Sequence, residues 1–176
     1  VEVGTQKAWE LCEKMNLPRI FYVTNMDDDN ASFRQVVEDL ENMYGKKIAP
    51  FQMPVRENEK FVGYVNVITE SGNRWQGKEV VPCEIPEYNK PNLQICRDTL
   101  MEAVAETSEE FMERYFGGDT FSEAEIRAAL RTNVMDGSVV PMTMGSNTLC
   151  QGIYTLLDDV VKYFPSPDKR KCAGIS

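Results

Sequence analysis

The fold is decided by a short stretch of sequence, Arg19-Ile-Phe-Tyr-Val-Thr-Asn-Met-Asp27. Four consecutive residues, Ile20 to Val23, are β-branched or aromatic, and neither glycine nor proline interrupts them. Because helical patterns flank this run, it predicts a strand that is buried on both faces of an α/β sheet. Ligands of such sheets collect at the carboxyl ends of the strands, so Asp27 is the first candidate for a ligand contact.

A second apolar run, Val139 to Met144, also predicts a buried strand, and it ends on the polar residues Gly145-Ser146-Asn147-Thr148. The hydrophobic period changes between the two runs, because residues 47–85 have the alternating pattern of short strands. Residues 88–116 have a helical pattern, and a capping box at Ser122-Glu-Ala-Glu125 opens a further helix. We therefore predict one α/β domain that is interrupted by an inserted α+β subdomain.

The composition excludes several classes of function. The 176 residues carry a formal net charge of −9, which argues against sequence-independent binding of DNA or other nucleic acid. Histidine is absent, so a histidine-activated nucleophile is excluded, and the 5 cysteines form no CxxC pair that would indicate a zinc site. No apolar run is long enough to span a membrane, and the first residues do not form a signal peptide. We expect a cytoplasmic protein without a metal site, a catalytic residue or a membrane partner.

The residues that directly follow the two predicted strands, 24–30 and 145–148, are called the polar tips here. Each polar tip admits two interpretations from its residue types alone. The carboxylate of Asp27 could accept two N–H bonds from a planar base, or it could cap the next helix together with Asp28 to Asn30. The N–H groups of Gly145 to Thr148 could bind a base edge or an anion, or could form an ordinary strand-to-helix turn. The three aspartates do not form a calcium loop, since its glycine and distal glutamate are missing. The chain contains no phosphate loop of the pattern GxxxxGK followed by serine or threonine.

Several further motifs occur in an order that is known from one family. The motifs are Pro18-Arg-Ile-Phe-Tyr-Val-Thr-Asn-Met-Asp27, Phe51-Gln-Met-Pro54, Phe61-Val-Gly63, Glu84-Ile-Pro86, Glu109-Glu-Phe-Met-Glu-Arg-Tyr-Phe-Gly-Gly118, Gly145-Ser146 and Tyr163-Phe-Pro-Ser-Pro-Asp168. From about Val1 to Asp168 the chain resembles the translational GTPases, most closely bacterial elongation factor G. The first motif is similar to the guanine-specificity strand with its Asn-Lys-x-Asp sequence, and Gly145-Ser146 is similar to the start of the second guanine loop. The motifs between them are similar to the G′ insertion of elongation factor G.

This resemblance implies a partial P-loop GTPase domain of the α/β class, interrupted by an α+β G′ subdomain. We expect residues 1–46 and 138–168 to belong to the G domain, residues 47–137 to form the G′ insertion, and residues 169–176 to form a tail. The phosphate loop, both switches, the Mg²⁺ ligands and the catalytic histidine of the family would lie before Val1. The chain alone is then expected not to hydrolyse GTP, and strand 20–23 would lie at an open sheet edge.

The resemblance also assigns residues to guanine recognition. They are Thr24, Asn25, Met26, Asp27, Ser146 and Asn147. The family has asparagine and lysine where this chain has Thr24 and Asn25, and alanine where it has Asn147. The parent protein is expected to bind GTP or GDP and to act on the ribosome in translocation, with the G′ face binding the ribosomal stalk protein. Two alternatives are a ribosome-binding module with eroded nucleotide binding and a relative of the ribosomal protection proteins.

Overall fold

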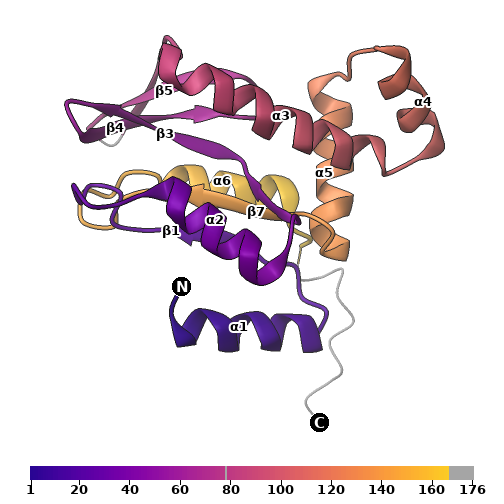
Figure 1. The fold of residues 1–176 in the computed structure, drawn as a ribbon, viewed down its shortest axis with the longest axis horizontal. Coiled ribbons are helices and arrows are strands. Elements are labelled where there is room, and N and C mark those ends of the chain that lie inside the picture. Colours follow the sequence, from indigo (N-terminus) through magenta and orange to yellow (C-terminus); the bar gives the residue numbers. More distant parts are fainter. Residues whose placement is uncertain (78, 167–176) are drawn as a thin grey trace.

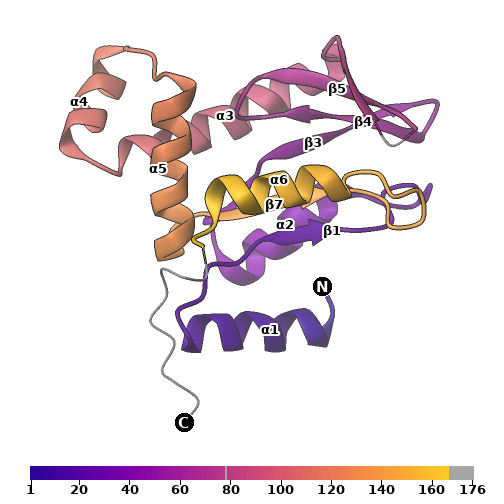
Figure 2. The same ribbon diagram turned by 180° about the vertical axis from the view of Figure 1, so that it is seen from behind.

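The computed structural model describes residues 1–77 and 79–166, which contain two sheets of different kinds (Figure 1). The first sheet is parallel, with the strand order β1-β7-β2. These strands are β1 (Phe21–Val23), β7 (Val140–Met144) and β2 (Ile48–Pro50). Every residue of the central strand β7 is buried, because α2 (Phe33–Tyr44) covers one face of the sheet and α6 (Ile153–Tyr163) covers the other (Figures 1 and 2).

The second sheet is antiparallel, with the strand order β3-β4-β5-β6. These strands are β3 (Gln52–Glu57), β4 (Lys60–Asn66), β5 (Ser71–Gln76) and β6 (Glu79–Cys83). The chain then enters a helical segment, which consists of the short 3-10 helix η1 (Glu87–Asn89), α3 (Lys90–Ala105), α4 (Glu109–Gly117) and α5 (Glu123–Asp136). Helix α3 runs along the antiparallel sheet, and α1 (Val3–Lys14) lies on the far side of the parallel sheet (Figures 1 and 2).

Two apolar clusters hold these layers together. One joins the antiparallel sheet to α3 and α5, and its fully buried members include Phe51, Val65, Leu100, Val104 and Leu130. The other surrounds the parallel sheet and includes Trp9, Met26, Leu40, Ile48, Met142, Phe61 and Tyr64. Strand β4 therefore supplies side chains to both clusters, because Val65 belongs to the first and Tyr64 to the second. The two sheets share one continuous packing arrangement through this strand.

The predicted α/β unit with a parallel sheet and a separate antiparallel part is confirmed. The strands expected within residues 47–85 do not all join one sheet, because β2 pairs with β7 in the parallel sheet and only β3 pairs with β4. The antiparallel unit consequently starts at Gln52, five residues after the expected start of the insertion at Lys47.

Strand β1 lies at the edge of the described parallel sheet. The expected tail at 169–176 lies outside the described residues. Within the described residues, no helix has the length and apolar character that a membrane crossing requires.

Candidate functional site

The two polar tips lie side by side at the carboxyl ends of β1 and β7. The parallel register places Val23 opposite Met144. Beyond the strands, the N–H of Met26 donates to the carbonyl of Gly145 at 3.1 Å, and the N–H of Gly145 donates to the carbonyl of Val23 at 2.9 Å. The structure therefore brings residues 24–27 and 145–147 into one site, although more than a hundred residues separate them in the sequence.

Asp27 carries the carboxylate of this site that is best suited to a ligand. The residue is half-buried, and its Oδ1 atom is shielded from solvent without a hydrogen-bond partner. A buried polar atom that lacks a partner costs about 1–3 kcal/mol. An external N–H donor that reaches Oδ1 would remove this cost, so the atom fits the edge of a ligand that presents such donors.

The interpretation of Asp27 as a helix cap is wrong. Helix α2 is capped by Ser32, whose Oγ accepts a hydrogen bond from the N–H of Gln35 at 3.3 Å. Asp28 instead organises the loop before the cap, because its Oδ1 accepts from the N–H of Asn30 at 2.8 Å. Ser32 takes the capping role because it has extended backbone geometry directly before the first helical residue.

The three residues before Asp27 have different surroundings. Met26 is fully buried in the cluster around the parallel sheet and anchors the loop there. Asn25 has a φ of 58°, a left-handed conformation that asparagine tolerates better than most residues. Thr24 and Asn25 line a cavity of about 400 Å³ beside the first turn of α2, and Asp27 is not part of its lining. Thr24 and Asn25, two of the three residues that depart from the family pattern, thus line this cavity together with Asp28.

The second tip is shaped by Ser146. Its Oγ accepts from the N–H of Leu149 at 3.0 Å, and its backbone N–H and carbonyl pair with Gln151 at 2.9 and 3.0 Å. Ser146 is completely buried and supports the turn from within, whereas Asn147 is exposed. Ser146 is no helix cap either, because α6 begins only after Gly152, which makes no side-chain capping bond. The backbone N–H groups of Asn147 and Thr148 form no backbone hydrogen bond with another described residue.

Sequence reasoning missed Tyr22 as part of the site. The Tyr22 hydroxyl donates to the carbonyl of Gln151 at 3.2 Å and thereby ties β1 to the second tip. Burial raises the pKa of Tyr22, so its hydroxyl keeps the proton that makes it a donor. Only the position of Tyr22, directly before the polar tip, could have pointed to this role in the sequence.

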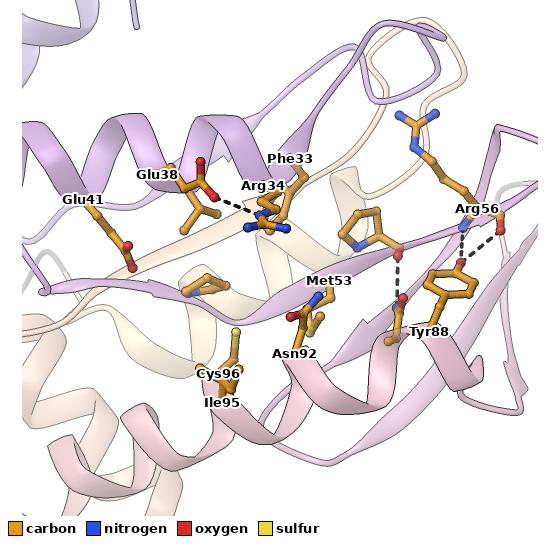
Figure 3. A pocket seen from close by; sticks show the side chains of 14 residues that line it. Phe33, Arg34, Glu38, Glu41, Met53, Arg56, Tyr88, Asn92, Ile95 and Cys96 are labelled. Atoms are coloured by element: carbon orange, nitrogen blue, oxygen red, sulfur yellow. Dashed lines mark hydrogen bonds and ion pairs between the residues drawn. The ribbon is translucent and has the colours of Figure 1, made fainter.

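A larger cavity lies away from the tips. It is an open groove of about 460 Å³ between α2 and α3, with Phe33, Met53 and Ile95 among its lining residues (Figure 3). None of the residues expected to recognise guanine lines it. In the described residues, no group of three or more histidine, cysteine, aspartate or glutamate side chains could hold a metal ion.

The paired tips on a parallel sheet agree with a comparison against known families. Residues 1–166 match the model of the elongation factor Tu GTP binding domain. The chain belongs to this family. It is a translational GTPase G domain, and the resemblance inferred from the order of its motifs is confirmed. Guanine nucleotide is accordingly the ligand of the family.

Relatives of this GTP-binding domain are considerably longer. The chain is 36% identical over 171 residues to elongation factor G of Neorickettsia sennetsu (strain ATCC VR-367 / Miyayama). The aligned region covers 95% of this chain and 25% of that protein. A crystal structure of a protein from Thermus thermophilus matches with a TM-score of 0.87 and 30% identity, over 97% of this chain and 26% of that one. The chain therefore spans about a quarter of the length of these relatives.

Proposed function

We propose that this chain carries the guanine-recognition loops of an elongation-factor-G-like GTPase that acts on the ribosome in translocation. The observation that supports this most is the buried Oδ1 atom of Asp27, which has no partner at the carboxyl end of a parallel strand. Guanine presents two N–H donors, on N1 and on the exocyclic amine, along one edge. A carboxylate accepts such a pair with both oxygens, and hydrogen bonds to a charged group are the stronger kind.

The remaining residues of the two tips have supporting roles in this proposal. The free N–H groups of Asn147 and Thr148 donate to the carbonyl oxygen of guanine, and Ser146 holds the turn that presents them. Met26 anchors the first loop in the core, and Thr24 and Asn25 flank the base. The phosphates and Mg²⁺ need groups that residues 1–166 lack, since the sequence contains no phosphate loop. We therefore expect no GTP hydrolysis by this chain alone, and steady phosphate release would contradict that expectation.

The antiparallel unit is, in this proposal, the G′ insertion, and it binds the ribosomal stalk protein. Its helices present large apolar side chains to solvent, among them Ile95 on α3, which is 64% exposed, and Phe116 on α4, which is 79% exposed. Exposed apolar side chains of this kind are typical of contact surfaces when they gather in patches. Replacement of Phe116 by serine should weaken binding of the stalk protein in a pull-down with purified components.

A ribosome-binding module without nucleotide function is the second candidate. The departures at Thr24 and Asn25 from the guanine-specificity motif favour it. A relative of the ribosomal protection proteins is a third possibility, which the domains that follow the G domain would distinguish. Calorimetric titration of the longest natural protein that contains this chain with GDP, GTP and ATP separates the first two candidates. Absence of guanine binding would favour the module.

Replacement of Asp27 by asparagine tests the guanine proposal directly. An amide accepts with one atom and donates with the other, so Asp27→Asn should weaken GDP binding by roughly 10- to 100-fold, the loss of one charge-assisted bond. The same variant should gain affinity for xanthosine diphosphate, whose base has a carbonyl in place of the exocyclic amine. Asp29→Asn is the matched control, because Asp29 is exposed and neighbours the site. Unchanged GDP affinity in Asp27→Asn would contradict the role of this carboxylate.

A further inference from the structure

A single arginine of the antiparallel sheet binds the loop that carries Asp27. Arg56 lies on β3, and its Nη2 atom donates to the carbonyl of Met26 at 2.9 Å and to that of Ala31 at 3.0 Å. A longer contact of 3.4 Å reaches the carbonyl of Asp28. These carbonyls lie on both sides of Asp27 in the sequence, so one guanidinium forms hydrogen bonds with both ends of the loop.

The hairpin that carries Arg56 has an irregularity directly beside this residue. The pairing of β3 with β4 shifts between Val55, which faces Gly63, and Arg56, which faces Phe61. The extra residue is Val62 on β4, and a bulge of this kind bends the ladder next to Arg56. The hairpin then closes with two left-handed residues, as a two-residue type I′ turn requires. The carbonyl of the second, Glu59, accepts from Nη1 of Arg56 at 2.6 Å. The guanidinium thus donates to its own hairpin through Nη1 and to the Asp27 loop through Nη2.

The backbone of Arg56 is held in turn by Tyr88. The Tyr88 hydroxyl accepts from the N–H of Arg56 at 2.8 Å and donates to its carbonyl at 3.0 Å. Figure 3 shows this double contact, with the Arg56 side chain extending away from the Tyr88 ring. The neighbouring Asn89 donates from Nδ2 to the carbonyl of Pro54 at 3.1 Å. The 3-10 helix η1, directly before α3, is therefore attached to β3 on both sides of Val55.

We propose that Arg56 is a positioning residue for guanine selectivity, and that Tyr88 fixes its place. The inference rests on the proposed function for the identity of the ligand. Arg56 restricts the backbone at residues 26–31, and this restriction holds the Asp27 carboxylate where it meets the two N–H donors of the base. Without Arg56, the half-buried carbonyls of Met26 and Ala31 lose their donor, and the loop samples arrangements in which Asp27 misses the exocyclic amine.

The fork of the arginine side chain is essential to this role. Lysine keeps the charge but has a single nitrogen, so it cannot serve Glu59 and the Asp27 loop in the same geometry. Arg56→Lys should therefore behave like Arg56→Met rather than like the wild type. Arg74→Met is the matched control, because Arg74 also lies on the antiparallel sheet and forms its ion pair with the exposed Glu57.

The first measurement is hydrogen exchange on this chain without nucleotide. Arg56→Met should raise the exchange rates of the amides at 28 and 31 by about tenfold, because both are held by turns within the loop. Arg74→Met should leave these rates unchanged. Unchanged rates in Arg56→Met would overturn the inference, whatever the nucleotide affinity of the protein is.

The second measurement is the ratio of the affinities for GDP and IDP in the longest natural protein that contains this chain. IDP lacks the exocyclic amine, so the ratio reports how well Asp27 meets the base. Arg56→Met should lower this ratio by about tenfold, whereas a merely structural defect would weaken both nucleotides equally. Tyr88→Phe should lower the ratio in the same direction, although Tyr88 contacts Arg56 rather than the Asp27 loop.

The outcomes separate this inference from the proposed function. If the wild-type protein binds no guanine nucleotide, this result would contradict the proposed function and, with it, the selectivity role of Arg56. Guanine binding with an unchanged GDP/IDP ratio in Arg56→Met would overturn the positioning role alone. If Arg56→Met does not fold, Tyr88→Phe carries the test, because it removes only one hydroxyl group from an exposed tyrosine and keeps the arginine side chain itself in the protein.

Discussion

Gly145 occupies the point where β1 and the second polar tip approach each other most closely. A Cβ atom at this residue would lie 2.1 Å from the Tyr22 hydroxyl oxygen and 2.2 Å from the carbonyl oxygen of Gln151. The Gly145 backbone also bonds to Val23 and Met26 in the first tip. A single position therefore sets the separation of the two loops that carry Asp27 and Asn147.

Replacement of Gly145 by alanine should destabilise the chain and move the tips apart. We expect a loss of about 1–3 kcal/mol in the free energy of unfolding, since a methyl group must displace backbone and a tyrosine ring. Weaker guanine binding should accompany it. Urea denaturation measures the loss, and Gly117→Ala is the control, because nothing lies within 4 Å of its Cβ position. Equal stability of Gly145→Ala and the wild type would show that the approach is not tight.

At the scale of single elements, α5 is the helix whose start is most completely specified. The Ser122 Oγ accepts from the N–H of Glu125 at 3.3 Å, and the Glu125 carboxylate accepts from the N–H of Ser122 at 2.8 Å. Arg114 of α4 binds the same carboxylate at 2.6 Å. This ion pair, with the Ser122 bonds, lowers the pKa of Glu125 to about 2. The capping box predicted at this place is confirmed, and it also connects α5 to α4.

Removal of the Ser122 hydroxyl should cost about 1 kcal/mol of stability, the usual loss for a serine cap. The comparison is Ser108→Ala, which removes a cap from α4 that has no reciprocal bond. We expect the larger loss for Ser122→Ala, because Glu125 then loses one of its donors as well. Thermal unfolding of both variants provides the measurement, and a larger loss for Ser108→Ala would contradict the importance of the box.

At the scale of the whole molecule, a buried polar pair joins the two sheets. Nε2 of Gln52, on β3 of the antiparallel sheet, donates to Oδ2 of Asp159, on the helix that covers the parallel sheet, at 3.3 Å. Both side chains are buried, and Oε1 of Gln52 has no partner. Burial raises the pKa of Asp159 to about 7, an effect that the nearby Lys162 opposes and Asp158 reinforces. The junction between the two parts of the molecule is therefore sensitive to pH.

This aspartate should make stability fall as the pH rises through the acid range. An unfolded aspartate loses its proton near pH 4, whereas folded Asp159 keeps it to about pH 7. The folded state therefore binds more protons in this window, and the free energy of unfolding decreases from about pH 4 to about pH 7 by at most about 4 kcal/mol.

Urea denaturation at a series of pH values measures this slope in the wild type and in Asp159→Asn. The difference between the two profiles isolates Asp159 from carboxylates such as Glu13 and Glu125, whose lowered pKa values give the opposite slope. Asp29→Asn is the control, because this aspartate is exposed and lies in the loop before α2 rather than beside Asp159. Parallel profiles for the wild type and Asp159→Asn would contradict the prediction.

Local sequence patterns predicted the strands and helix starts well, because these elements depend mainly on residues that are neighbours in the sequence. The apolar runs at 20–23 and 139–144 specified two strands, but only β7 is buried on both faces as predicted. The expectation of a buried strand at 20–23 is wrong, because β1 lies at the edge of the described parallel sheet and its three residues are half-buried. The Ser122 capping box specified the start of α5 for a similar reason. Whether Asp27 capped a helix could not be predicted, because several polar residues before α2 were equally suitable and backbone geometry selected Ser32.

The sequence by itself determined the α/β class, the family and the two polar tips, because hydrophobic period, capping and motif order are written in consecutive residues. The tertiary structure alone decided that β2 joins the parallel sheet, that the Asp27 oxygen stays without a partner, and that Arg56 binds the loop around it. Each of these depends on atoms that are distant in the sequence. A strand or a polar side chain pairs with a strand edge or a carbonyl that is still available once the two sheets have packed, and local sequence does not show which ones those are.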